Sequence, residues 1–378
     1  MYFSFLSGLM GRFRSDANNE DDIEDSLEPC HYDRSDSSEY SWLPVADDNS
    51  QVTSFIEGDF ASTPTGVSQE VASYGQVSID TQVQTEWLSS SPIVIGDPTH
   101  EFEPKPISKA LESGNYRPDT VLDAWSTKHF AIRAASVRGA KHRYAGLPRQ
   151  DDLAIKLKTD NDAVIIAVAD GVSSASHSHL AATVVTRYVT QWLYQCNGET
   201  YHDIDWNTLM SHASNALVNQ AHQIQQSAGN NLSDIRAIVA TTIVCAVVYP
   251  SISKDCLCVN LASVGDSGAY ILDENSIKPI CGGKKSDDIL FVENITSCLP
   301  DNCCVPDTIQ FEILPGQLLL LATDGIGDAL GDGTGLVSDT FSTIFRSRIP
   351  SIIEFAHLTD FSRKSFIDDR SLVALWPR

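Results

Sequence analysis

Three aspartates stand at the ends of apolar runs, where their carboxylates could bind a cation. Asp170 follows the run 163–169 and Asp324 follows a second such run, whereas Asp368 precedes a third. Apolar runs of this length, rich in β-branched residues in the first case, are typical of buried strands. A carboxylate at a buried strand end is unfavourable unless it is paired or bound to a cation. Several of them together therefore predict a metal site built of hard oxygen ligands.

The elements that must position these aspartates are predicted from hydrophobic periodicity. Strands are expected at 130–136, 152–157, 163–169, 238–248, 256–264, 269–272, 311–314, 318–323 and 372–376, and helices at 178–196, 206–226 and 336–348. Residues 139–149 are expected to form a loop. The order lacks a regular βαβ alternation, which argues against a doubly wound parallel sheet. An α+β fold with two antiparallel sheets and helices packed outside them accounts for it.

The charge of the chain limits its partners and divides it into two parts. The formal net charge is −24 over 378 residues, so we expect no nucleic-acid binding and no binding to anionic membranes, both of which need Lys and Arg. The first hundred residues hold three arginines against eighteen Asp and Glu residues. This composition predicts that residues 1–120 are acidic and largely disordered, and that residues 121–378 form the folded domain. Two apolar islands, 42–45 and 87–95, could dock on that domain or on a partner.

The cysteines and the hydropathy pattern predict a cytoplasmic protein. Nine cysteines are an odd number with irregular spacing, which does not match a disulfide framework. Neither Cys256-x-Cys258 nor Cys303-Cys304 forms a paired C-x-x-C zinc motif, so we expect small buried thiols in a reducing compartment. No stretch approaches the roughly 20 apolar residues of a membrane span. The apolar residues 1–10 precede the first arginines, which is the wrong order for a secretory signal.

Five short acidic segments lie next to predicted strands. They are Gln150-Asp151-Asp152, Ala169-Asp170-Gly171, Val264-Gly265-Asp266-Ser267-Gly268, Ala322-Thr323-Asp324-Gly325 and Asp368-Asp369-Arg370-Ser371. A single Asp-Gly pair after a strand is usually only a turn. All five lie in one continuous stretch of predicted strands, and this favours a shared site.

This ordered set resembles the metal-dependent protein phosphatase family, type 2C, and especially its bacterial branch. The segment Ser136-Val137-Arg138-Gly139 with His142 and Gln150-Asp151 is similar to the first motif of that branch. The other four segments are similar to the family's second motif, its G-D-S turn, its T-D-G strand end and its closing D-[DN]-x-[ST] motif. The resemblance covers about residues 121–378. It implies a central β-sandwich of two antiparallel sheets flanked by helix pairs, in agreement with the order of elements.

The resemblance also implies an activity. It implies a serine/threonine protein phosphatase that hydrolyses phosphoprotein by a metal-bridged water, with Mn²⁺ or Mg²⁺ as cofactor. Two ions are expected, with a third, weaker position. Two cations about 3.5–4 Å apart can clamp the attacking and leaving oxygens of an in-line displacement, so several carboxylates are needed to hold them. The partners would be a phosphorylated protein substrate and a cognate Ser/Thr kinase.

The motifs transfer individual roles to this chain. Asp170 would bridge the two ions, and Gly171 would offer its carbonyl oxygen. Asp266 together with Asp324 would provide the third position. The full set of implied metal ligands is Asp151, Asp170, Gly171, Asp266, Asp324 and Asp368, and Asp151, Asp170, Asp324 and Asp368 are the implied catalytic residues.

The chain departs from the family at the phosphate-binding residue. The family often has an arginine five residues before Asp151, where this chain has Gly146. His142 and Arg138 are the predicted phosphate-binding residues, and Arg143 is a further substitute. Asp152 stands where the family has a small or apolar residue, so it could extend the metal site or face solvent.

Two alternatives to an active phosphatase are a regulatory module and a two-metal nuclease. A catalytically weak or inactive member of the same fold could act as a binding or regulatory module, a state that loss of metal aspartates would mark. None of the four implied catalytic aspartates is missing. A two-metal nuclease is disfavoured by the acidity of the chain.

The segment 278–305 is expected to form a loop that shapes the substrate site. The acidic N-terminal region could inhibit the site by competing for its cations.

Overall fold

The structure is a computed structural model, and it describes residues 92–108, 117–196, 201–228, 234–252, 254–273, 276–283 and 297–378. All of these residues lie within one compact unit of the chain, Ala72–Arg378. Most of the N-terminal region, including the island at 42–45, lies outside the described residues, as does the middle of the predicted substrate loop. The predictions made for those parts, and the domain boundary near residue 120, stay predictions.

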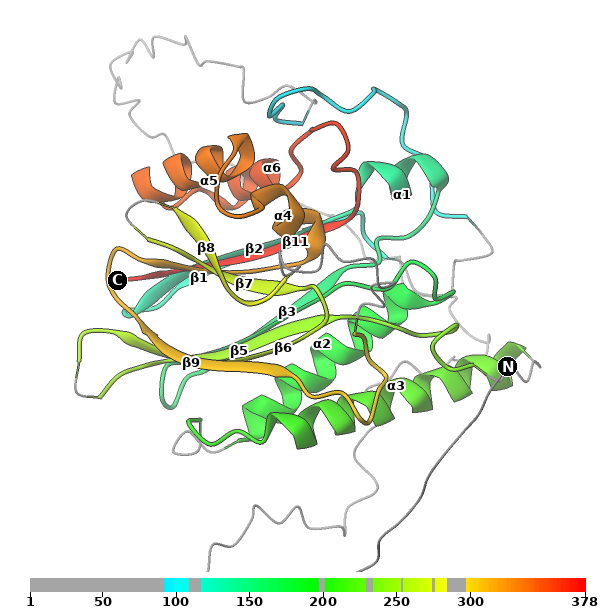
Figure 1. The fold of residues 1–378 in the computed structure, drawn as a ribbon, viewed down its shortest axis with the longest axis horizontal. Helices are drawn as coiled ribbons and strands as arrows, with labels where there is room; N and C mark the ends of the chain where they lie inside the picture. Colours follow the sequence, from blue (N-terminus) through cyan, green and yellow to red (C-terminus); the bar gives the residue numbers. More distant parts are fainter. Residues whose placement is uncertain are drawn as a thin grey trace, which may run out of the picture. The chain divides into compact units, whose positions relative to one another are not determined.

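Two antiparallel sheets form the centre of the fold (Figure 1). The six-stranded sheet has the order β1-β2-β11-β10-β7-β8 and the five-stranded sheet the order β3-β4-β5-β6-β9. The first sheet consists of β1 (Thr120–Ser126), β2 (Phe130–Val137), β7 (Gly268–Leu272), β8 (Ile277–Gly282), β10 (Leu318–Ala322) and β11 (Arg370–Pro377). The second consists of β3 (Asp152–Lys158), β4 (Ala163–Ala169), β5 (Ile243–Pro250), β6 (Leu257–Val264) and β9 (Asp307–Ile313). The predicted α+β sandwich of two antiparallel sheets is confirmed.

Helices cover the outer face of each sheet (Figure 1). The five-stranded sheet carries α2 (Ser178–Gln195) and α3 (Trp206–Ala228), and the six-stranded sheet carries α4 (Asp324–Leu330), α5 (Leu336–Ser347) and α6 (Ile352–Thr359). The predicted loop 139–149 contains a short helix instead, α1 (Ala140–Ala145). It ends at Gly146, whose φ of 69° is left-handed, and six residues are too few for a helical period to show in the sequence. Among the helices of the described residues, none is long and apolar enough to cross a membrane.

The unbroken apolar runs are explained by burial on both faces. In β4, Ile165 packs in the core under α2 and α3, whereas Ile166 packs between the two sheets. In β10, Leu320 packs in the core under α4 to α6, whereas Leu321 packs between the sheets. A strand covered on both faces loses the apolar–polar alternation of a half-buried strand. The four layers therefore follow from the same runs that mark the strands in the sequence.

The strand register brings the acidic segments to one end of the sandwich. Asp152 pairs with Ala169, so Asp151 and Asp170 lie beyond the same end of the β3–β4 pair. Ala322 pairs with Leu372 on one side and with Gly268 on the other, so the residues around them extend from the same end of β10, β11 and β7. Antiparallel pairing thus places the end of one strand beside the start of its neighbour. Residues that are far apart in the chain become neighbours in this way.

Residues 92–108, here called the strap, lie against α1 and against the loop 360–367. Ile95 is buried, and its N–H donates to the carbonyl oxygen of Ser362 at 3.1 Å. Further along, the N–H of Lys105 donates to the carbonyl oxygen of Arg143 in α1 at 2.9 Å. The described part of the apolar island 87–95 therefore packs on the folded domain.

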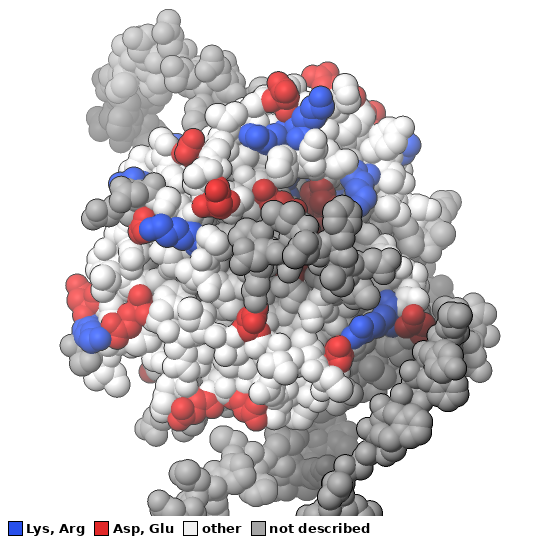
Figure 2. Space-filling model, viewed as in Figure 1, with Lys and Arg blue, Asp and Glu red and all other residues white. Residues whose placement is uncertain are grey.

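Charged side chains of both signs are interspersed over the described part of the face seen in Figure 2. Among the described residues, Lys254 pairs with Glu312 at 2.7 Å and Lys128 pairs with the half-buried Asp162 at 3.2 Å. Ion pairs at the surface contribute little to the stability of a fold, because water screens both charges.

The eight cysteines in the described ranges are all free thiols.

Candidate metal centre

Three carboxylates converge at this end of the sandwich. Asp170, Asp266 and Asp324 each offer one carboxylate oxygen, and these oxygens lie within 4.8 Å of one another. Asp170 follows β4, Asp266 lies in the turn where the chain crosses from β6 to β7, and Asp324 begins α4. Both sheets thus contribute to the group. Divalent cations such as Mg²⁺ and Mn²⁺ prefer carboxylate oxygens, so the spacing and the chemistry both fit a metal ion.

Asp151 lies next to this group and is buried. Its Oδ2 accepts a hydrogen bond from the Thr323 hydroxyl at 2.7 Å, and that hydroxyl oxygen accepts the N–H of Ser371 at 2.9 Å. Its other oxygen, Oδ1, is buried and has no hydrogen-bond donor among the described residues. Burial and the negative charges of Asp369 and Asp324 raise the pKa of Asp151 well above its usual value. A bound cation would satisfy the orphaned oxygen and stabilise the charged form.

The pKa of the Asp170 carboxyl group is raised for the same two reasons. Burial raises its pKa well above the usual value, and the charges of Asp151 and Asp324 raise it further. Carboxylates that share a site without a cation between them oppose one another's ionisation. Divalent ions reverse that balance, because their charge favours the ionised carboxylates. These residues therefore fit the Mn²⁺ or Mg²⁺ that the motifs imply.

Two glycines allow the close approach of backbone segments around the group. A Cβ on Gly171 would lie 2.7 Å from the carbonyl oxygen of Ser178 at the start of α2 and 2.9 Å from that of Gln150. Gly265 has a φ of 94°, and a Cβ there would lie 2.6 Å from the carbonyl oxygen of Ser297. A side chain at either position would push these segments apart. The Asp-Gly and Gly-Asp pairs seen in the sequence thus serve packing as well as turn formation.

Asp368 and Asp369 have different environments although they are adjacent. Asp368 lies outside the three-carboxylate group and is 45% exposed, with the Lys141 Nζ 3.3 Å from its Oδ2. Asp369 is buried and accepts the N–H groups of Gly139 at 2.6 Å and Gln150 at 2.5 Å. Burial alone would raise the pKa of Asp369, but hydrogen bonds and the nearby His142 hold it below the usual value. The sequence signal for this role was only its position beside Asp368.

The two predicted phosphate-binding residues are both buried behind this segment. The His142 ring lies between two carboxylates, with Nδ1 2.8 Å from Asp369 Oδ2 and Nε2 3.9 Å from Asp368 Oδ1. Arg138 donates from Nη2 to the carbonyl oxygens of His142 at 3.0 Å and Lys105 at 3.2 Å. The Arg138 guanidinium therefore links α1 to the strap.

Asp152 corrects an expectation, because it neither faces solvent nor belongs to the carboxylate group. It is buried, and Arg117 and Arg149 each lie 3.6 Å from its carboxylate, with Arg187 at 3.9 Å. The Thr183 hydroxyl donates to it at 2.7 Å. Burial would raise its pKa, but the three guanidinium groups hold it below the usual value. The reason is that α2 supplies Thr183 and Arg187 to this side of β3, which the local sequence does not reveal.

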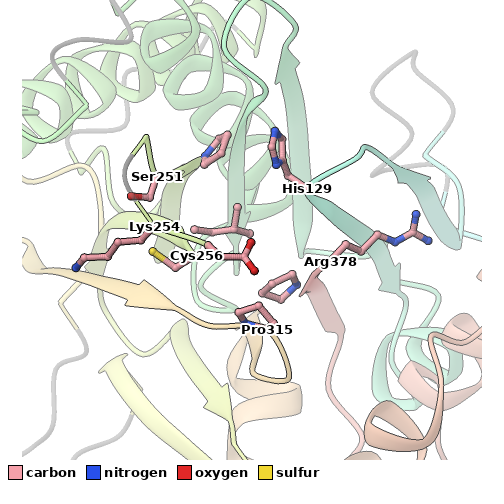
Figure 3. A pocket seen from close by; sticks show the side chains of 10 residues that line it. His129, Ser251, Lys254, Cys256, Pro315 and Arg378 are labelled. Carbon is pink, nitrogen blue, oxygen red and sulfur yellow. The ribbon is translucent and has the colours of Figure 1, made fainter.

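A small cavity lies at the other end of the strands (Figure 3). Its volume is about 90 Å³, and it is lined by His129, Pro250, Ser251, Lys254, Asp255, Cys256, Leu257, Pro315, Pro377 and Arg378. None of the predicted site residues is among them. The converging carboxylates, rather than this cavity, mark the candidate functional site.

Several solved structures with a similar fold are phosphatases. One is a bacterial serine phosphatase with 18% identity and a TM-score of 0.49. The match covers 65% of the present chain and 97% of the phosphatase chain. The catalytic domain of the serine/threonine phosphatase PstP, in complex with two manganese ions, has 17% identity and a TM-score of 0.43, covering 66% and 98%. Stp1 from Staphylococcus aureus has 15% identity and a TM-score of 0.46, covering 73% and 99%. No curated protein sequence matches the chain.

The family of the chain is shown by a match to a family model. The model described as "Protein phosphatase 2C" matches residues 138–354, which is more than half of the chain. The matched region begins at Arg138 and contains Asp151 and all three of the converging carboxylates. The chain therefore belongs to the protein phosphatase 2C family.

Proposed function

We propose that the protein is a metal-dependent serine/threonine protein phosphatase that acts on a phosphorylated protein. The observation that carries this proposal is the convergence of three carboxylate oxygens within 4.8 Å, in a chain of the protein phosphatase 2C family. Mn²⁺ or Mg²⁺ is the proposed cofactor, in two positions with a third, weaker one. A serine/threonine kinase would supply the substrate. The cytoplasmic location expected from the cysteines remains part of this proposal.

The proposed metal ligands divide between the group and its rim. Asp170, Asp266 and Asp324 would hold the ions directly, with the Gly171 carbonyl beside them. Asp151 would direct its orphaned Oδ1 toward them, and Asp368 would complete the set from the rim. When bound, such ions supply charge neutralisation for the phosphoryl oxygens and lower the pKa of a water that can attack phosphorus. The proposed catalytic residues are accordingly Asp151, Asp170, Asp324 and Asp368.

Other residues hold these ligands in place. Thr323 binds Asp151 through its hydroxyl and also joins β10 to β11 through Ser371. Asp369 holds the loop before β11 against the segment of Gly139 and Gln150. Groups that orient ligands in this way commonly change metal affinity or activity by about 10–100-fold when they are removed. From the motif, His142 and Arg138 are proposed to support the phosphate-binding segment from beneath. The His142 ring contacts Asp369 and Asp368, and Arg138 donates to the carbonyl oxygens of His142 and Lys105.

The experiment that tests the proposal measures Mn²⁺-dependent hydrolysis of an aryl phosphate and of a phosphothreonine peptide. The wild-type protein is compared with Asp324→Ala and with Asp255→Ala, a matched change at the opposite end of the strands. We expect Asp324→Ala to lose roughly 100-fold or more in turnover, because even the groups around metal ligands contribute about 10–100-fold. Asp255→Ala should behave as wild type.

Two results would count against the phosphatase. Equal turnover in wild type and Asp324→Ala would contradict a catalytic role for the carboxylate group. Mn²⁺ binding by calorimetry without any turnover in the wild type would instead support the binding or regulatory module.

A further inference from the structure

We propose that Lys141 supplies the cation that holds the phosphoryl group of the substrate, an inference that rests on the proposed function. A phosphate monoester carries negative charge into a site already crowded with carboxylates. Side-chain cations that contact phosphate oxygens offset this repulsion, with arginine as a fork and lysine as a point charge. The position where the family often has arginine is Gly146 in this chain. Another residue must therefore provide the charge.

The arginines around the site are already bound to other groups of the protein. Arg143 contacts Asp360 at 2.9 Å and Asp119 at 2.7 Å, and Arg138 donates to two carbonyl oxygens. Arg117 donates to the carbonyl oxygens of Arg149 and Asp151, at 2.5 and 2.8 Å. Moving any of them to a substrate would leave carboxylate or carbonyl oxygens of the protein without their donor, which is unfavourable.

Lys141 has the freedom that these arginines lack. Its side chain is 44% exposed, and its Nζ lies 3.3 Å from Oδ2 of Asp368, which is itself 45% exposed. Exposed ion pairs of this kind contribute little to stability, so the ammonium can exchange Asp368 for a phosphoryl oxygen. Its backbone is fixed, because the Lys141 N–H donates to the carbonyl oxygen of Ile367 at 2.9 Å.

Close backbone contacts connect the segment of Asp368, the partner of Lys141, to the start of α4 next to Asp324. A Cβ on Gly139 would lie 2.2 Å from the Asp368 carbonyl oxygen, and one on Gly325 would lie 1.9 Å from that of Asp369. The Asp368–Asp369 backbone is therefore in tight contact with Gly139 on one side and with Gly325, next to Asp324, on the other. Lys141 thus pairs with a residue whose backbone segment is packed against the residue that follows Asp324.

The test compares Lys141→Met and Lys141→Arg with Lys128→Met, which removes an exposed lysine of another Lys–Asp pair. Three quantities are measured on Mn²⁺-loaded protein: the inhibition constant of inorganic phosphate, its affinity by calorimetry, and the KM for a phosphothreonine peptide. We expect Lys141→Met to weaken phosphate binding and raise KM by about tenfold, the loss of one charged contact. Mn²⁺ affinity should stay within about twofold, Lys141→Arg should recover most of the loss, and Lys128→Met should match wild type.

Several outcomes would overturn the inference. Unchanged phosphate affinity in Lys141→Met would exclude Lys141 as the phosphate-binding cation. A loss of Mn²⁺ affinity equal to the loss of phosphate affinity would show that Lys141 acts only on the metal site. If the wild type has no turnover, the proposed function fails, but phosphate binding by calorimetry still decides the role of Lys141.

A second inference is carried by the backbone contacts of the strap. At one end, the N–H of Ser362 donates to the carbonyl oxygen of Ile93 and that of Lys364 to Asp97, both at 2.7 Å. At the other end, Ser108 donates to the carbonyl oxygen of Gly146 at 2.9 Å. We propose that the strap is a positioning segment, which holds α1 and the loop before Asp368 in one arrangement. The family model begins only at residue 138, so this device is outside the matched region.

Two neighbouring residues of the strap give a matched test. Ile95 is 5% exposed and Val94 is 54% exposed, so Ile95→Asp should release the strap and Val94→Asp should not. We expect Ile95→Asp to speed amide hydrogen exchange in 139–146 and 362–367 and to weaken phosphate binding several-fold, with exchange in β4 and β10 unchanged. If Ile95→Asp does not fold, Thr99→Val removes the hydrogen bond to the Arg363 carbonyl instead. Wild-type exchange and phosphate affinity in a folded strap variant would overturn this role.

Discussion

Asp151 and Asp152 are adjacent in the chain, yet their carboxylates lie in opposite electrostatic environments. Asp151 is buried beside other carboxylates, and its pKa is raised by burial and by the charges of Asp369 and Asp324. Asp152 is equally buried, but the guanidinium groups of Arg117, Arg149 and Arg187 lower its pKa in spite of burial. Successive residues of an extended chain point to opposite sides, so one carboxylate faces the metal centre and the other faces α2.

The difference separates two uses of a buried carboxylate. The environment of Asp152 is complete, because the protein itself supplies the positive charge and the hydroxyl of Thr183. The environment of Asp151 is incomplete without an added cation, because its Oδ1 is buried without a donor among the described residues. A structural carboxylate and a ligand carboxylate can thus be told apart by where the compensating charge comes from.

Removing a ligand carboxylate should abolish function without harming the fold. We expect Asp170→Asn to lose roughly 100-fold or more in turnover, since groups that merely orient metal ligands contribute about 10–100-fold. Mn²⁺ binding by calorimetry should weaken in parallel. The melting temperature in EDTA should stay equal or rise, because one charge is removed from a crowded group. A large fall in that melting temperature would contradict the contrast with Asp152.

Removing the structural carboxylate of Asp152 should have the opposite effects: the protein loses stability, whereas its Mn²⁺ affinity changes little. We expect Asp152→Asn to lower the free energy of unfolding by about 3 kcal/mol, because buried guanidinium groups lose their partner. Urea denaturation in EDTA measures this loss. The Mn²⁺ affinity of the folded fraction should change little. If Asp152→Asn is as stable as wild type but binds Mn²⁺ poorly, Asp152 belongs with the metal ligands.

Removal of the Thr323 hydroxyl, which donates to Asp151, should have a smaller effect on stability and on Mn²⁺ affinity. Thr323→Val keeps the shape of the side chain but removes the hydrogen bonds to Asp151 and Ser371. The expected loss is about 1–3 kcal/mol of unfolding free energy and about tenfold in Mn²⁺ affinity. Thr183→Val is the matched change on the Asp152 side, and it should reduce stability without reducing Mn²⁺ affinity.

The pH dependence of the free energy of unfolding of the metal-free protein should reveal the raised pKa values of the ligand carboxylates. The folded protein raises the pKa values of Asp151 and Asp170, so it binds more protons than the unfolded chain. Their contribution to stability therefore decreases as the pH rises from about 4, the unfolded pKa, through the raised folded values. Saturating Mn²⁺ should remove this decrease, and Asp170→Asn should reduce it. Urea denaturation at a series of pH values measures the slope.

The acidic segments and the fold class could be predicted from the chain because both depend on local pattern. Uninterrupted apolar runs predict strands covered on both faces, and the structure places β4 and β10 between a helical layer and the other sheet. The sequence pattern did not predict the short helices α1, α4 and α6 or the strands β1 and β8, and β8 corrects the expectation that the segment 278–305 begins as a loop. Six residues are too few to show a helical period, and β8 is partly exposed, with Lys278 and Pro279 at its centre.

The residues that can supply hard oxygen ligands, and their place next to strands of an α+β domain, follow from the amino-acid sequence. Which of them meet depends on the folded arrangement: Asp170, Asp266 and Asp324 converge, Asp368 pairs with Lys141, and Asp152 lies among three arginines. The contacts of Asp369, Lys141 and the strap likewise depend on the tertiary structure. The physical reason is that residue type and hydrophobic period are local, whereas a carboxylate's partners depend on strand register and on side chains hundreds of residues away.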